Sequence, residues 1–202
     1  MMFTHASNLI TYVILSPEPV SGDNYRSIHY LNHVSKFSDH IQFHIERMSA
    51  VRKVSTPYFT FLDSDDPIPQ GVRAPKNAGI LYGTEVFCKS DGTQTTKKPR
   101  PFNWMASIQS QFHIHKAVCN TQYAKCIIDL LPHGLYNTDI MVYSLLALWK
   151  GHEIDKDFIY EWNIHDGGIH HWRDAKRAVR NSTKWLFSNG HITIKKLNEL
   201  YG

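Results

Sequence analysis

The chain has 202 residues, of which 42% are hydrophobic, 12% aromatic and 20% charged. This composition excludes a disordered chain of low hydrophobicity, and the length suits one domain with a sizeable core. The longest apolar stretch, Ile140 to Trp149, spans about ten residues, whereas a membrane-spanning helix needs about twenty, so we expect no such helix. Because the N-terminus lacks the basic and apolar regions of a secretory signal, we expect a cytoplasmic protein.

Charge is unevenly distributed along the chain. Residues 172–202 contain seven of the 22 Lys and Arg residues against two acidic residues, a net charge of +5, whereas the rest of the chain sums to −1. This basic end favours a polyanionic partner, such as nucleic acid, a phosphate-bearing ligand or an anionic membrane surface. A solvated helix face is the alternative interpretation of the same pattern.

The first third of the chain predicts alternating strands and helices. Apolar and β-branched runs indicate strands over residues 9–15, 41–45 and 58–62, and helical spacing indicates helices over about 23–37 and over 47–54. Such alternation is typical of an α/β domain with a mostly parallel sheet. The last of these strands leads directly into the acidic turn Asp63–Asp66, and ligands of such sheets collect at the carboxyl ends of strands.

The remaining chain extends this pattern. We expect strands over 78–83, 84–88 and 154–164, a weakly ordered polar loop over 89–101, a helix from Asn137 to a glycine stop at Gly151, and a basic helix over about 173–187. The sequence therefore predicts one α/β domain, a mostly parallel central sheet flanked by helices over residues 1–171, with a basic helical C-terminal extension over residues 172–202.

The acidic turn is the first candidate site. Its three carboxylates, Asp63, Asp65 and Asp66, repel one another unless a cation compensates them. Carboxylate oxygens suit Mg²⁺ or Mn²⁺, whose open positions are usually filled by substrate phosphates. Ordinary turn chemistry is the alternative, since a Ser-Asp-Asp-Pro segment also favours a turn.

Two neighbouring segments carry a family resemblance. Ser49–Lys53 and Thr56–Asp66 are together similar to the family 2 glycosyltransferases of the GT-A fold, in which a Ser-x-x-Arg-Asn helix precedes a Gly-Glu-Tyr-x-x-Phe-Leu-Asp-x-Asp-Asp strand and turn. The resemblance implies a GT-A-like domain and a metal-dependent, inverting transfer of a sugar. The donor would be a nucleotide sugar, most simply a UDP-sugar, and the acceptor a hydroxyl group.

The resemblance also implies roles for residues on the donor side. Asp63 would lie near the ribose, Asp65 would hold the Mn²⁺ or Mg²⁺ that bridges the diphosphate, and Arg52 would approach the base. Ser64 would line the same donor site. The turn after the first strand would contact the nucleoside through Ser16, Pro17 and Glu18.

On the acceptor side, family members carry an acidic residue at the start of a helix. Asp139 occupies that place and is the predicted catalytic base, although a helix N-terminus favours an acidic residue in any case. Some GT-A enzymes complete the metal site with a late histidine from a flexible loop. His165, His170 and His171 flank such a loop, and we select His170 as the metal ligand; packing or solvent exposure is the alternative for all three.

The acceptor itself is not specified by the resemblance. The basic C-terminal segment, with aromatic residues between its Lys and Arg residues, suits a phosphate backbone, and on this basis DNA bearing a hydroxymethylated base is the less common of two candidate acceptors. A saccharide or lipid-linked saccharide at an anionic membrane surface is the alternative.

Two interpretations from other classes stay open. The chain lacks the Asp-Asp-Gly-Ser-x-Asp stretch that follows the second strand of the family, so a catalytically degenerate GT-A domain acting as a binding module is one alternative. A zinc site is another, although its scattered candidates fit no compact zinc module: His113, His115, Cys119, Cys126 and His133. The cysteines, which also include Cys88, form no C-x-x-C pair and are expected to be reduced core residues.

Overall fold

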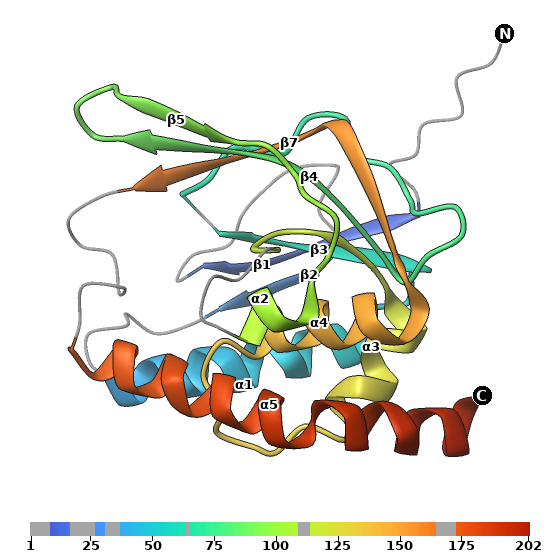
Figure 1. Ribbon diagram of the computed structural model, residues 1–202. Helices are drawn as coiled ribbons and strands as arrows, with labels where there is room; N and C mark the ends of the chain where they lie inside the picture. The colour runs from blue at the N-terminus through green and yellow to red at the C-terminus, as the bar shows by residue number, and fades with distance from the viewer. Residues whose placement is uncertain (1–8, 17–26, 31–36, 64, 109–113, 165–172) are drawn as a thin grey trace, which may run out of the picture.

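The computed structural model describes residues 9–16, 27–30, 37–63, 65–108, 114–164 and 173–202. Within these residues seven strands form one sheet in the order β2-β1-β3-β6-β4-β5, and β7 pairs with β4 (Figure 1). The strands are β1 (Ile10–Ser16), β2 (Ser27–Tyr30), β3 (Tyr58–Asp63), β4 (Ile80–Lys89), β5 (Gln94–Lys97), β6 (Val118–Asn120) and β7 (His152–Ile164).

Five strands of the described sheet run in one direction, as expected for a mostly parallel sheet, but β5 and β6 run against them, so the sheet is mixed. Strand β1 is parallel to β2 and β3, and β4 is parallel to β7. Strand β6 is antiparallel to both of its neighbours, β3 and β4. Strand β5 pairs antiparallel with β4 because a tight turn containing Gly92 reverses the chain between them. This strand lies inside the polar segment 89–101, which was expected to be a weakly ordered loop; its threonines favour a strand.

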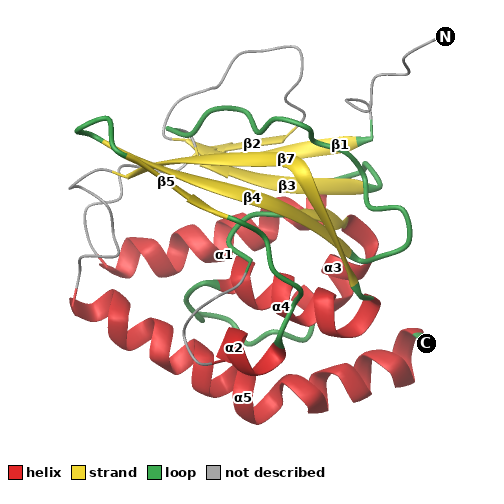
Figure 2. Ribbon diagram, turned by 45° about the horizontal axis from the view of Figure 1, so that its top comes forward, coloured by secondary structure: helices red, strands yellow, loops and turns green. Residues whose placement is uncertain are grey.

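The helices lie on one face of the sheet, as both views show (Figures 1 and 2). They are α1 (Phe37–Lys53), α2 (Trp104–Ile108), α3 (Thr121–Ile128), α4 (Thr138–Lys150) and α5 (Arg173–Tyr201). Helix α5 runs along the outside of this helical layer. The α/β class, the flanking helices and the C-terminal helix are therefore confirmed, and α5 is longer than the sequence indicated.

Two expectations for the N-terminal part are wrong. Residues 27–30 form β2 rather than part of a helix, and residues 41–45 belong to α1 rather than to a strand. The alternating apolar residues around position 43 suggested a strand. In the structure the buried side chains of α1 recur at His44, Met48 and Val51, which is helical spacing, and Ile45 is exposed.

The main core lies between the sheet and the helices. Phe59 and Phe61 of β3 pack there with Val51 of α1 and with Met141 and Leu145 of α4, all of them fully or almost fully buried. Burial of this size is the main source of stability in a domain of this length. Leu186 and Leu197 attach α5 to the same core.

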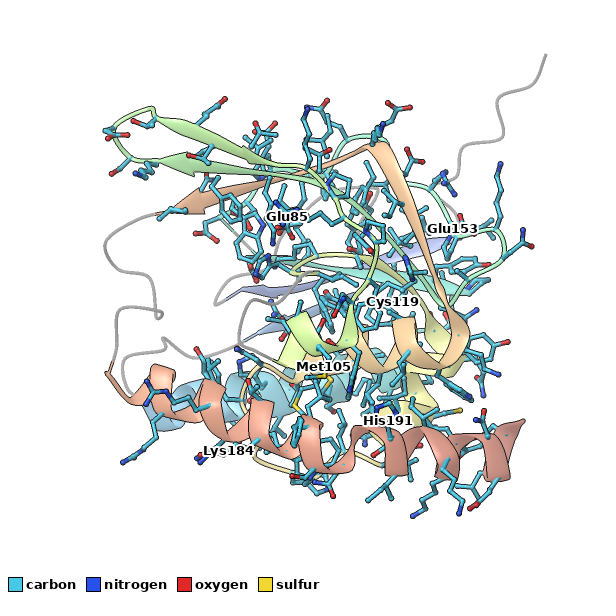
Figure 3. All side chains as sticks on the ribbon, viewed as in Figure 1. Glu85, Met105, Cys119, Glu153, Lys184 and His191 are labelled. Carbon is cyan, nitrogen blue, oxygen red and sulfur yellow. The ribbon has the colours of Figure 1, made fainter. Side chains whose placement is uncertain are left out.

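The three cysteines are free thiols. Cys119 and Cys126 are buried, as expected for core residues, and Cys88 of β4 is partly exposed. Figure 3 shows Cys119 in the interior and Lys184 on the outer side of α5. No helix among the described residues is long and apolar enough to span a membrane.

Gly83 interrupts the pairing of β4 with β7. The register shifts between Tyr82 and Thr84, and a Cβ atom on Gly83 would lie 2.0 Å from the carbonyl oxygen of Phe158. Only glycine therefore permits this close approach of the two backbones. The shift directly precedes the pair Glu85 and Tyr160, whose side chains belong to the site described next.

Candidate active site

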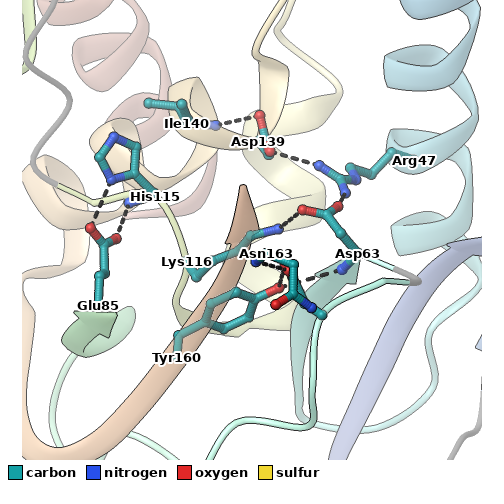
Figure 4. A network of polar contacts seen from close by, with 10 residues as sticks. Arg47, Asp63, Glu85, His115, Lys116, Asp139, Ile140, Tyr160 and Asn163 are labelled. Carbon is teal, nitrogen blue, oxygen red and sulfur yellow. Dashed lines mark hydrogen bonds and ion pairs between the residues drawn. The ribbon is translucent and has the colours of Figure 1, made fainter. Parts of the chain in front are cut away.

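Four charged side chains form a continuous chain at the carboxyl end of β3 (Figure 4). Arg47 of α1 donates through Nη2 to Oδ1 of Asp63 and through Nη1 to Oδ2 of Asp139, the latter at 2.8 Å. Lys116, which precedes β6, donates from Nζ to Oδ2 of Asp63. We call these four linked side chains, in the order Asp139–Arg47–Asp63–Lys116, the ion-pair chain.

The ion-pair chain is largely removed from solvent. The side chains of Arg47 and Lys116 are 4% and 1% exposed, and those of Asp139 and Asp63 are 10% and 29% exposed. Burial alone would raise the pKa of Asp63, but the charges of Lys116 and Arg47 and their hydrogen bonds hold that pKa well below its ordinary range. Because two cations face two carboxylates, the net charge of the ion-pair chain is zero without a bound ion.

Asp66, the last carboxylate of the acidic turn, is fixed by β7. Its Oδ2 accepts a hydrogen bond from the Tyr160 hydroxyl at 2.8 Å, and its Oδ1 accepts one from the backbone N–H of Asn163 at 2.8 Å. Burial, with a contribution from the nearby charge of Asp63, raises the pKa of Asp66 to about 6, although both hydrogen bonds oppose this shift.

The raised pKa of Asp66 gives a testable pH dependence. Between about pH 4, near the ordinary pKa of an aspartate in an unfolded chain, and pH 6, the folded protein keeps a proton that the unfolded chain has lost. This group therefore lowers the free energy of unfolding as the pH rises through that range. In urea titrations with EDTA present, Asp66→Asn should remove this decline relative to the wild type. A decline of the same size in both proteins would contradict the assignment.

Asp65 differs from its two neighbours because it is exposed. Its carbonyl oxygen accepts a hydrogen bond from the side-chain amide of Asn163, which ties the turn to β7. Among the described residues, no three or more His, Cys, Asp or Glu side chains are grouped closely enough to hold a metal ion. The predicted ligand His170 and its neighbours His165 and His171 lie outside the described residues.

The donor set nevertheless fits one type of divalent cation site. Mg²⁺ is often bound by one or two carboxylates together with substrate phosphates and water. Asp65 suits that arrangement because its carboxylate is exposed at the edge of the sheet where β3 ends. Asp63 and Asp66 are less accessible, and both oxygens of each accept hydrogen bonds from protein donors.

Arg52 does not join this site. Its guanidinium donates to Asp129 at 3.1 Å and also lies 3.5 Å from the carbonyl oxygen of Ile128. Helix α1 ends one residue later, just before β3 begins, whereas Asp63 is at the end of β3. In addition, Arg52 is five positions after Arg47, so the two side chains are about 140° apart around the helix axis. Arg47 therefore lies beside Asp63, whereas Arg52, which was predicted to approach the base, pairs with Asp129 instead.

Asp139, the predicted catalytic base, is joined to Asp63 through Arg47, and each of its oxygens accepts one hydrogen bond. Oδ2 accepts from Arg47, and Oδ1 accepts from the backbone N–H of Ile140 at 2.9 Å. Helix α4 precedes β7 and returns antiparallel to it, so its first turn lies near the carboxyl ends of the parallel strands. Of the turn that was predicted to contact the nucleoside, Pro17 and Glu18 lie outside the described residues, and Ser16 is the last residue of β1. Ser64 of the acidic turn also lies outside the described residues.

A second polar group lies beside the ion-pair chain (Figure 4). Glu85 of β4 accepts from the backbone N–H of His115 at 3.1 Å, and its Oε2 is 2.8 Å from Nδ1 of the His115 ring. Glu85 is only 7% exposed and His115 is 26% exposed. Burial opposes ionisation, but His115 and Lys97 together hold the pKa of Glu85 below its ordinary value.

Trp162 of β7 connects this group to the ion-pair chain. Its ring is perpendicular to that of His115, with the ring centroids 5.9 Å apart, and Nζ of Lys116 lies 4.6 Å from its centroid. From the sequence, His115 was a candidate only for a zinc site, and no motif indicated Glu85, Arg47 or Lys116. Zinc coordination is not supported for the described residues, since His115 is held by Glu85 and Cys119 is fully buried.

Comparisons with known proteins leave the family open. No protein-family model matches the chain, and no curated protein matches it.

Proposed function

We propose that the protein is a glycosyltransferase that uses a nucleotide sugar, most simply a UDP-sugar. One observation carries the proposal: Arg47 joins Asp63 to Asp139. These two carboxylates come from the two segments that the family resemblance pairs, the acidic turn of the donor side and the first turn of the acceptor-side helix. Their meeting at the carboxyl end of β3, the usual ligand-binding edge of an α/β sheet, supports the same assignment.

On the donor side, Asp65 would hold Mn²⁺ or Mg²⁺ together with the diphosphate of the nucleotide sugar. When bound, such a cation offsets the negative charge that develops on a departing diphosphate. The ion-pair chain fixes the backbone of the acidic turn through Asp63, and Tyr160 and Asn163 fix it through Asp66. The turn is thus held before a ligand arrives, and such preorganisation lowers the cost of binding.

Turnover of a nucleotide sugar tests this proposal. The full chain is incubated with UDP-glucose, UDP-N-acetylglucosamine or GDP-mannose and Mn²⁺, and release of UDP or GDP is measured with water as the acceptor. We expect release by the wild type, loss of release with EDTA and loss in Asp65→Asn. Asp129→Asn is the matched control, because Asp129 is exposed and pairs with Arg52 outside the site. Lack of release from every donor would support the degenerate binding module instead.

The exposed side of α5 supports a phosphate-bearing acceptor. Four basic residues are exposed there: Arg180, Lys184, Lys195 and Lys196. Nζ of Lys195 lies 4.0 Å from a carboxylate oxygen of Glu199 on the same helix. DNA bearing a hydroxymethylated base fits this surface as acceptor, and a lipid-linked saccharide is the alternative.

Binding measurements separate the two acceptors. For DNA, we expect affinity for a duplex to fall steeply between 50 and 200 mM salt, as counterion release requires, and to be weaker in Lys184→Glu/Lys195→Glu. Binding to vesicles with phosphatidylserine, without binding to DNA, would favour the lipid-linked acceptor. Equal binding of the variant and the wild type to both probes would remove α5 from the acceptor site.

A further inference from the structure

The contact with Glu85 fixes the protonation of the His115 ring. A neutral imidazole carries its proton on one nitrogen and a lone pair on the other. Nδ1 lies 2.8 Å from a carboxylate oxygen, which only accepts hydrogen bonds, and 3.4 Å from Nζ of Lys97, which only donates them. We assign the proton to Nδ1 because its contact with Glu85 is the shorter of the two. Lys97 lies 3.4 Å from the same oxygen and pairs with the carboxylate. The lone pair is therefore on Nε2, and Figure 4 shows that ring nitrogen turned away from Glu85.

This arrangement contrasts with that of Asp139. Asp139 is bound by a guanidinium and by a backbone N–H, so each of its oxygens already accepts a hydrogen bond. Protonation of Asp139 would remove the negative charge that pairs with Arg47, and this buried cation would lose one of its two charged partners. Protonation of His115 at Nε2 breaks no ion pair, because it leaves the bond to Glu85 intact and places the imidazolium beside a carboxylate that it shares with Lys97.

We propose that His115 is the proton acceptor of the glycosyl transfer and that Glu85 is its positioning residue. This inference rests on the proposed function and names the residue that activates the acceptor. Trp162 brings the ring into the site, because it contacts both His115 and Lys116, and Lys116 is bonded to Asp63.

In the proposed step, the hydroxyl oxygen of the acceptor forms a bond to the anomeric carbon of the donor. The bond between that carbon and the diphosphate oxygen breaks, and the diphosphate leaves with the bonding electron pair. The hydroxyl proton passes to Nε2 of His115, and the imidazolium later releases it to solvent. With water as the acceptor, the products are the free sugar, the nucleoside diphosphate and one proton.

Hydrolysis of UDP-glucose in Mn²⁺ tests the assignment through kcat, KM and the pH profile. We expect His115→Gln to lower kcat on the order of 100-fold with KM unchanged, which is the usual contribution of a general base. The wild-type rate should rise with pH through one ionisation, and that rise should be absent in His115→Gln. Among the described residues, the charged groups near the ring are Glu85 of β4 and Lys97 of β5, which contact Nδ1, and the sequence neighbour Lys116, which lies over Trp162. Glu85→Gln should keep the pH-dependent rise and lower kcat less.

Two variants serve as controls. His133→Gln changes an exposed histidine outside the site and should behave as the wild type. Asp139→Asn should leave the pH-dependent rise in place. A kcat of His115→Gln within threefold of the wild type would show that His115 is not the base. If the pH-dependent rise disappears in Asp139→Asn and persists in His115→Gln, the base is Asp139 and not His115.

A measurement that needs no turnover tests the same geometry. Nitrogen-15 spectra of the full chain, with His115→Gln for assignment, should show the neutral His115 ring protonated at Nδ1; a proton on Nε2 would overturn the inference. Failure of the proposed function has a different signature, because it would remove binding of UDP and GDP by the wild type. If the wild type binds UDP and hydrolyses UDP-glucose while His115→Gln does the same, only the assignment of His115 fails.

Discussion

Replacing Arg47 by methionine should lower the free energy of unfolding by about 4 kcal/mol. Arg47 is almost fully buried and bonds to carboxylates from two different parts of the chain, Asp63 and Asp139. Without the guanidinium, Asp139 has no cation among its hydrogen-bond partners and is left as a buried negative charge, whereas Asp63 keeps Lys116. Losing one partner of a buried pair is costly because the remaining charge stays desolvated.

Urea denaturation at pH 7 measures this effect, and Arg52→Met is its matched control. Arg52 is on the same helix and also pairs with an aspartate, but both partners are exposed, so its removal should cost no more than about 0.5 kcal/mol. Combining Arg47→Met with Asp139→Asn should recover part of the loss, because the unpaired charge is then gone. Equal losses in Arg47→Met and Arg52→Met would show that the ion-pair chain contributes nothing special.

Asp63→Asn should cost about 3 kcal/mol at pH 7, with an effect that depends on pH. The pKa of Asp63 in the folded protein is well below its ordinary range, so its charge stabilises the fold above the unfolded pKa of about 3.9. That contribution is lost as the pH falls through the pKa of the folded state. Once Asp63 is protonated, the wild type resembles the variant, because Arg47 and Lys116 have then lost the same negative charge.

The difference between the wild type and Asp63→Asn should therefore shrink from pH 7 toward pH 2, as measured by denaturation with EDTA present. Asp65→Asn is the matched control, since it removes a charge from the same turn at an exposed position. It should leave the free energy of unfolding within about 0.5 kcal/mol of the wild type. A pH-independent difference for Asp63→Asn would mean that the residue is not held as a carboxylate between the two cations.

The sequence predicted those elements whose periodicity is clear and whose ends carry recognisable residues. Helix α4 begins next to Asn137 and ends at Gly151, which has a positive φ angle as a glycine stop requires. Strands β3, β4 and β7 were also expected where they occur. Sheet directions were not accessible from alternation alone, because the antiparallel insertion of the three-residue strand β6 is decided by tertiary pairing.

Some residues of the site could be predicted from local motifs, and others could not. The acidic turn and Asp139 were selected from local motifs, and they lie at the same end of the sheet. Arg47 was missed because the family motif contains Arg52 and not Arg47. In addition, a strand was expected at 41–45, so the sequence did not show that one long helix places Arg47 and Arg52 on different sides. Lys116, Glu85 and His115 precede or belong to β6 and β4, so their association depends on a strand pairing that no local motif indicates.

Calorimetric titration of the wild type with UDP and with GDP, each in Mn²⁺ and in EDTA, tests the donor site most directly. We expect binding of one nucleotide that requires the metal, a loss of affinity of at least about tenfold in Asp65→Asn and no change in Asp129→Asn. Such binding would establish the carboxyl end of β3 as a metal-dependent nucleotide site. Absence of binding under every condition, or equal binding by Asp65→Asn, would contradict the assignment of the acidic turn to a nucleotide-sugar donor.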